Sequence, residues 1–122
     1  ADVVVHASEP DEEAGALADA PGDAVGAAFG DRLVAAALVL RAALRRMEGG
    51  SVLLIAPGDG NPPLSGAVEA ALGRLVQAES KPAGPRVNAL LAGRDSTQTA
   101  RAAVWLSSDE AGGVRGSCVR LR

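Results

Sequence analysis

Four short runs rich in apolar residues alternate along the chain with longer segments of helical periodicity. The runs cover residues 3–5, 52–55, 86–91 and 118–121. Apolar residues at consecutive positions are typical of strands buried on both faces of a parallel sheet. Residues that break regular structure follow two of the runs: Pro57 with Gly58 after the second, and Gly93 after the third. We therefore expect four strands.

Between the runs, apolar residues recur every three or four positions, which is the spacing of one face of a helix. These helical segments cover residues 23–47, 65–79 and 97–107. Gly49 and Gly50 end the first segment, and Ser65 stands where a side-chain cap would begin the second. The order β-α-β-α-β-α-β predicts right-handed crossovers and one parallel sheet with helices on both faces.

Composition limits the chemistry that the chain can perform. Its 122 residues suffice for one small domain, and a net charge of −3 argues against nucleic acid and anionic membranes as partners. A single Cys provides neither a disulfide framework nor a cysteine-based zinc site, and we expect a cytoplasmic protein. No apolar run is as long as a membrane span. With no Tyr and one His, mechanisms that need a tyrosine acid or a histidine cluster are excluded within this chain.

Five segments, in order, carry the pattern of a known family. They are residues 2–8, 33–44, 49–55, 86–97 and 106–116. The most specific is Arg-Val-Asn-Ala at residues 86–89, with Gly93 and Thr97 behind it as in a Pro-Gly-x-x-x-Thr element. Together they resemble the C-terminal half of the short-chain dehydrogenase/reductase family. The resemblance implies a partial Rossmann-like α/β fold, the second half of the family's doubly wound sheet. It would form one domain over residues 1–122, without the N-terminal cofactor-binding half.

The same resemblance aligns the family's catalytic positions with residues of different chemistry. The family's helix Asn falls on Arg32, its Ser on Pro57, its Tyr on Ser65 and its Lys on Glu69. Proline has no hydroxyl, a serine hydroxyl titrates far above a tyrosine phenol, and Glu brings a negative charge where Lys holds the nicotinamide ribose. A Gly-rich phosphate loop is also missing from the sequence. We therefore expect no catalytic residue, no metal and no cofactor bound by this chain alone, with NAD(P) left to a partner chain.

In the family, the long central helix and the helix after it form the interface between subunits. Both helices remain amphipathic here, so the resemblance implies an interface through them. Its residues would be Phe29, Leu33, Ala36, Leu40, Leu44, Val68, Leu72 and Leu75. We expect a hetero-oligomer in which this subunit stabilises or regulates a related NAD(P)-dependent dehydrogenase, or pairing with a second copy. One alternative is the C-terminal piece of an oxidoreductase that functions only with a separate cofactor-binding chain; another is a small ligand-binding or adaptor domain.

Two features predict that the isolated chain associates. Residues 3–5 would lie at an open edge of the sheet, and such an edge invites pairing. The apolar stripe of residues 25–47 would add a second surface, and Leu40→Asp at its middle is expected to dissociate the complex.

A few single residues could bind a metal or act in hydrolysis, but a structural role explains each of them more simply. His6 is expected to be a structural histidine rather than a metal ligand, and Cys118 a small buried residue. Ser65 and Glu69 are interpreted as a helix cap and a solvated acid rather than a hydrolase pair. Trp105 is expected in the core, with contact at an interface as the second choice. The acidic residues 11–13 are expected in a solvated loop, with the docking of a basic partner as the lesser alternative.

Overall fold

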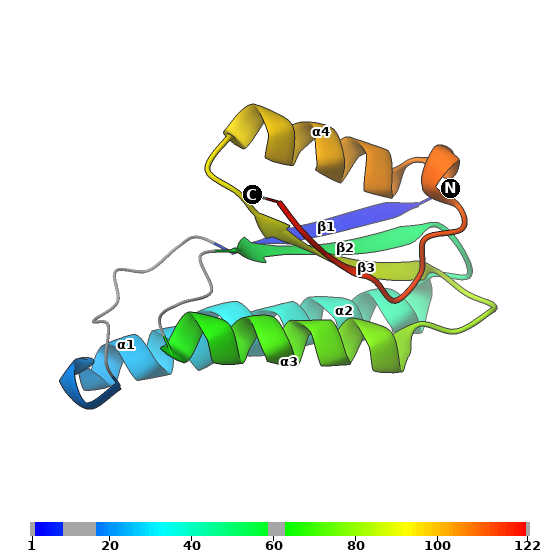
Figure 1. The fold of residues 1–122 in the computed structure, drawn as a ribbon. Coiled ribbons are helices and arrows are strands. Elements are labelled where there is room, and N and C mark those ends of the chain that lie inside the picture. The colour runs from blue at the N-terminus through cyan, green and yellow to red at the C-terminus, as the bar shows by residue number, and fades with distance from the viewer. Residues whose placement is uncertain (1, 9–16, 59–62, 122) are drawn as a thin grey trace.

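The computed structural model describes residues 2–8, 17–58 and 63–121. These residues contain one four-stranded sheet. The strands are β1 (Val3–Ala7), β2 (Ser51–Pro57), β3 (Arg86–Ala92) and β4 (Cys118–Arg120). All neighbouring pairs are parallel, and the strand order is β1-β2-β3-β4 (Figure 1). The expected α/β fold with a partial Rossmann-like sheet is confirmed.

Helices cover both faces of this sheet. They are α1 (Gly22–Ala27), η2 (Ala28–Val34), α2 (Ala35–Arg46), α3 (Pro63–Glu79) and α4 (Ser96–Ser107), with short 3₁₀ turns at η1 (Leu17–Asp19) and η3 (Asp109–Ala111). Figure 1 shows α2 and α3 side by side on one face and α4 on the other. Within the described residues, none of these helices is long and apolar enough to cross a membrane.

The long helix expected over residues 23–47 is confirmed, but its middle is wound more widely than the sequence pattern implies. Segment η2 is a π-helix, in which the backbone N–H of Ala35 donates to the carbonyl of Gly30, five residues back. The wider turn shifts which side chains face the sheet. Ala28 and Arg32 become buried, and Phe29 of the expected apolar stripe is left 38% exposed.

The centre of the sheet is the pair β2 and β3, which are matched from Ser51 opposite Arg86 to Pro57 opposite Ala92. Nearly every residue of both strands is buried, as expected for strands covered on both faces. The larger core lies between these strands and α2 and α3. A smaller cluster beneath α4 contains Leu53, Leu90 and Leu106.

Several residues expected at a subunit interface belong to the larger core instead. The four buried within the chain are Ala36, Leu40, Val68 and Leu72, each at most 2% exposed. A further three, Leu33, Leu44 and Leu75, are partly buried and pack against that core. Each helix turns its apolar stripe to the sheet because covering the sheet buries the most apolar surface. These four side chains therefore belong to this chain's own core, which corrects their assignment to a subunit interface; that Leu40→Asp dissociates a complex stays a prediction.

Three single-residue expectations also fail. Helix α3 begins at Pro63, so Ser65 lies inside it and is 2% exposed rather than acting as its cap. Trp105 is 45% exposed on α4, because Leu106 is the residue that this helix buries. Cys118 is exposed, because the short strand β4 forms an edge of the sheet.

A tight turn before β2 depends on a glycine. Gly50 has a φ of +85°, and a Cβ there would collide with the carbonyl oxygen of Asp2. The turn leads directly into the sheet, since the N–H of Ser51 donates to that carbonyl at 3.0 Å and the N–H of Arg86 donates to the carbonyl of Gly50 at 2.9 Å. The close approach of two backbones explains why Gly is needed here.

We predict that Gly50→Ala lowers the free energy of unfolding by about 2–3 kcal/mol, because it combines a positive φ with a backbone collision. Gly49→Ala is the matched control, since no atom lies within 4 Å of a Cβ at that position. Urea unfolding measures both. Equal, small changes for the two variants would show that the turn does not need glycine.

We predict that Leu40→Asp and Leu38→Asp, two residues apart on α2, have very different effects. Leu40 is 2% exposed and Leu38 is 57% exposed. A cavity and a buried carboxylate at Leu40 should cost at least about 4 kcal/mol, and Leu38→Asp should stay within about 0.5 kcal/mol. Thermal and urea unfolding of dilute protein give the comparison. A stable Leu40→Asp variant would contradict the packing of α2 described above.

Candidate functional site

The carboxyl ends of the parallel strands are where α/β sheets normally bind ligands. Here β2 ends at Pro57, and the N–H of Gly58 donates to the carbonyl of Ala92, the last residue of β3, at 3.0 Å. Strand β4 ends at Arg120. The side chains around this edge come from η2, α3 and β4, and they form two contacts that hold these elements together.

The first contact joins the long helix to α3. The guanidinium of Arg32 donates to the hydroxyl of Ser65 at 3.0 Å. Both residues are buried, at 3% and 2% exposed. The π-helical winding of η2 is what turns Arg32 inward, and the stripe of α3 that faces the core carries Ser65.

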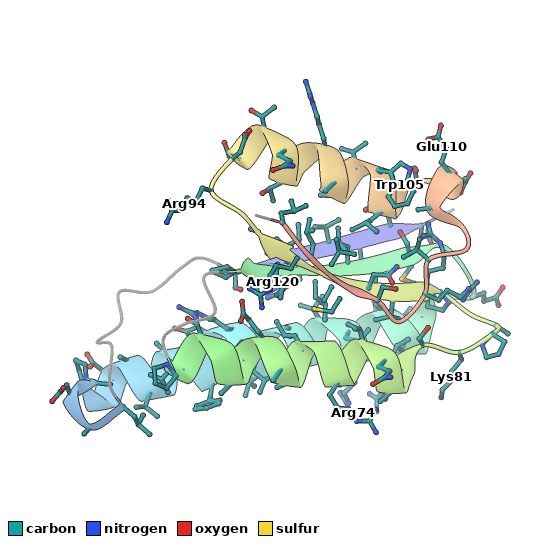
Figure 2. All side chains as sticks on the ribbon, in the orientation of Figure 1. Arg74, Lys81, Arg94, Trp105, Glu110 and Arg120 are labelled. Carbon is teal, nitrogen blue, oxygen red and sulfur yellow. The ribbon has the colours of Figure 1, made fainter. Side chains whose placement is uncertain are left out.

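The second contact joins α3 to β4 and to the end of β2. Both carboxylate oxygens of Glu69 accept from Arg120, at 3.2 and 3.1 Å, and Arg120 also donates to the carbonyl of Gly58 at 2.7 Å. Figure 2 shows Arg120 on the side of the sheet that α3 covers. The hydrogen bonds to Glu69 raise the pKa of Arg120 above its ordinary value. Glu69 is 6% exposed, so its interpretation as a solvated acid is wrong.

These contacts restrict the chemistry of the edge. A nucleophilic serine needs a neighbour that accepts its proton, and a guanidinium, as in Arg32, cannot do so. The other candidate nucleophile is Cys118 on β4. Partial burial raises the pKa of its thiol, which outweighs the opposing effect of Arg120. The thiol therefore stays protonated near neutral pH and is a poor nucleophile.

His6 lies on β1, opposite Leu54 of β2. Its Nε2 is buried and has no hydrogen-bond partner among the described residues. No three His, Cys, Asp or Glu side chains within 2–8, 17–58 and 63–121 are grouped so that they could hold a metal ion. The acidic residues 9 and 11–13, which neighbour His6 in sequence, lie outside the described residues.

Two polar residues of β3, the strand with the most specific sequence match, have structural partners. Arg86 donates to the carbonyls of Leu106 at 3.1 Å, of Ala111 at 2.8 Å and of Ser108 at 2.8 Å. These carbonyls lie at the end of α4 and in the turn after it, so Arg86 fixes the path of the chain there. Asn88 binds the segment before β4 through the carbonyl of Val114 and the N–H of Ser117.

The sequence offers one sign that Ser65 and Glu69 make internal contacts, and helical periodicity alone does not reveal it. Ser65 and Glu69 fall on the same face of α3 as Val68, Leu72 and Val76, which face the core. A carboxylate on a buried helical face requires a cationic or hydrogen-bonding partner. The sequence did not identify that partner, since Arg120 is 51 positions away and belongs to a strand of three residues.

Comparison with known proteins gives matches among solved structures. No protein-family model and no curated protein sequence matches the chain. An acetoin dehydrogenase from Salmonella typhimurium superposes with a TM-score of 0.80 at 20% identity, covering 98% of this chain and 62% of that one. An enoyl-[acyl-carrier-protein] reductase (NADH) from Aquifex aeolicus VF5 gives 0.78 at 25% identity, covering 98% and 59%. A short chain dehydrogenase from Mycobacterium smegmatis gives 0.78 at 20% identity, covering 99% and 58%.

Strand order, parallel pairing and the two helical layers define a Rossmann-like α/β unit. More particularly, the chain has the fold of the C-terminal part of short-chain dehydrogenases/reductases, and this confirms the resemblance found in the sequence. It spans about 60% of the length of the proteins it matches.

We predict that Arg120→Ala lowers the stability of the fold, because it leaves the carboxylate of Glu69 buried without its cation. Arg120→Ala combined with Glu69→Gln should recover part of the loss, since the neutral amide has no charge to compensate. Urea midpoints of the wild type, both single variants and the double variant give the coupling. Strictly additive effects would show that the two side chains do not interact in solution.

Proposed function

We propose that this chain is a catalytically inactive subunit of the short-chain dehydrogenase/reductase type, which assembles with another subunit and thereby stabilises or regulates a dehydrogenase. One observation carries the proposal: residues aligned with the family's catalytic positions have internal structural partners. Arg32 is bonded to Ser65, and Glu69 to Arg120. Side chains held in this way stabilise the fold and are not free to act on a substrate.

The same contacts make the edge a poor fit for the nicotinamide end of NAD(P). The family's Lys holds the nicotinamide ribose, whereas Glu69 at that position has both oxygens bonded to Arg120. Pro57, at the position of the catalytic Ser, offers no hydroxyl. Arg120 also ties β4 across the end of β2 through Gly58. These features support a chain that binds no dinucleotide by itself, so that any NAD(P) belongs to a partner.

The outer face of the long helix supports the assembly role. Phe29, Val34 and Leu38 are 38%, 51% and 57% exposed there. Apolar side chains gathered on one exposed face are typical of surfaces that bind another protein. This face replaces the buried stripe as the candidate interface of the long helix.

A second candidate function is favoured by a different surface. Strand β1 is an edge of the described sheet, and its Val3 and Val5 are about half exposed. A cleft of about 310 Å³ lies between these residues and α4, where Val104 is 72% exposed. An apolar strand edge of this kind accepts a further strand. This edge suits the second candidate function, in which the chain is part of an oxidoreductase that works only with a separate cofactor-binding chain. Adding that second chain to this one would then create dinucleotide binding.

We predict that the purified chain binds neither NAD(H) nor NADP(H), because the groups that would receive the nicotinamide ribose are already bonded inside the protein. Isothermal titration and nicotinamide fluorescence measure this directly. Micromolar binding to the wild-type chain would contradict the proposed function.

The control variant restores the family's catalytic residues with Ser65→Tyr and Glu69→Lys together. We expect no binding and no ketone reduction, because both positions are buried and the change removes the partners of Arg32 and Arg120. Circular dichroism establishes whether the variant is folded. Turnover by this variant would show that the site needs only two side chains to work.

A further inference from the structure

The amino ends of the strands lie at the end of the sheet opposite the site described above, and a cavity of about 550 Å³ opens there. Its walls include Val3, Ser51 and Arg86, which are the first residues of β1, β2 and β3. The end of α4 and the turn after it supply further walls, among them Ser107 and Asp109. A cavity of this volume is large enough to hold a small organic molecule.

Arg86 brings a positive charge to the floor of this cavity. The residue is 7% exposed, and its Nη1 and Nη2 atoms donate to three backbone carbonyls. A guanidinium carries five N–H groups. The one on Nε and one on Nη2 have no hydrogen-bond partner among the described residues, and no carboxylate of those residues pairs with Arg86. Since carbonyls do not neutralise a buried charge, the floor favours an anion.

Two serines add hydroxyl groups beside this charge. The Oγ atom of Ser107 is buried and has no hydrogen-bond partner within the part of the chain that the structure describes. Ser51 is 1% exposed, and its Oγ donates to the carbonyl of Ser107 over 3.4 Å, which is long for a hydroxyl donor. A buried hydroxyl without a good partner costs free energy. Rotation about the Cα–Cβ bond redirects a serine hydroxyl without moving the backbone, so an anion in the cavity could accept from both.

The rim of the cavity has a mixed charge. Asp2, Asp109 and Arg115 line it and are exposed. Water and salt screen charges at such positions, so they act on a ligand more weakly than the buried Arg86 does. Carboxylates at the rim favour a ligand whose outer part carries N–H or O–H groups. The cavity therefore fits a small polar molecule with one anionic group at its inner end.

We propose that this cavity binds a small polar molecule through an oxyanion group, either a carboxylate or a phosphate, which Arg86, Ser51 and Ser107 receive. The site is separate from the residues aligned with the family's catalytic positions. It is also independent of the assembly role proposed above, because it requires neither a partner chain nor a dinucleotide.

An NMR titration of the wild-type chain tests the site. The Nε–H resonance of Arg86 is followed while sodium phosphate or sodium succinate is added at constant ionic strength. At least one of the two anions should shift this resonance saturably, with a dissociation constant of about 1 mM or tighter. Saturation by phosphate alone or by succinate alone identifies the oxyanion group that the site prefers. The absence of a saturable shift with either anion would overturn the inference.

Variants at Gly49 change the charge of the rim without touching Arg86, which the fold needs at the end of α4. Gly49 lines the cavity, and no atom lies within 4 Å of a Cβ there. Gly49→Glu should weaken anion binding at least about threefold, and Gly49→Lys should strengthen it, because the added charges have opposite signs. Gly26→Glu is the matched control: a Cβ there is also free of contacts, and Figure 1 shows its helix α1 at the far end of the molecule from the start of β1.

Ser107→Ala removes a hydroxyl that bonds to no other described residue. It should weaken anion binding and leave the urea midpoint unchanged or raised, since the orphaned hydroxyl is lost. Dissociation constants that ignore the charge at Gly49, or that Gly26→Glu changes as much as Gly49→Glu does, would contradict the site. So would a Ser107→Ala variant that binds the anion as tightly as the wild type.

Discussion

Among the described residues, three charged side chains are buried, and the hydrogen-bond partners of their charged groups determine how the elements of the fold are joined. Arg32 with Ser65 connects the long helix to α3. Glu69 with Arg120 connects α3 to the last strand. Arg86 fixes the end of α4 through three carbonyls. The core is built from Ala, Val and Leu, which can replace one another and therefore fix the packing of the elements only loosely. The polar contacts, which join particular atoms, specify how the helices and the last strand lie relative to one another.

The same contacts connect the fold to its proposed role. In a short-chain dehydrogenase the carboxyl ends of the strands form an open site for cofactor and substrate, as expected for a doubly wound sheet. Here the residues aligned with the catalytic positions hold η2, α3 and β4 to one another, and Arg120 reaches across the end of β2. The proposal of a subunit that acts through assembly rests on these internal contacts and on the exposed apolar side chains of α2 and β1.

Much of the fold was predictable from the sequence because it depends on local periodicity. The strands, the crossover helices and the parallel order all follow from spacing, and the structure confirms them. The π-helical turn over Ala28–Val34 was not predicted, because a simple count of three or four residues per turn assumes a regular helix. That turn changed the positions of Phe29 and Arg32.

The ion pair of Glu69 was missed for another reason: its partner lies far along the chain and comes close only in the folded sheet. Which face of an amphipathic helix remains exposed likewise depends on the sheet beneath it, so residues such as Leu40 were assigned to the wrong surface.

Side-chain NMR of the arginines tests the central claim most directly, namely that Arg32 and Arg120 are structural groups held by Ser65 and Glu69. Each guanidinium should rotate slowly about its Nε–Cζ bond and give resolved Nη resonances that excess NADH or NADPH leaves unchanged. Arg74 is exposed on α3 and points away from the sheet in Figure 2, so it provides a freely rotating reference. Averaged resonances for Arg32 and Arg120 like those of Arg74, or resonances that shift when the dinucleotide is added, would contradict the account.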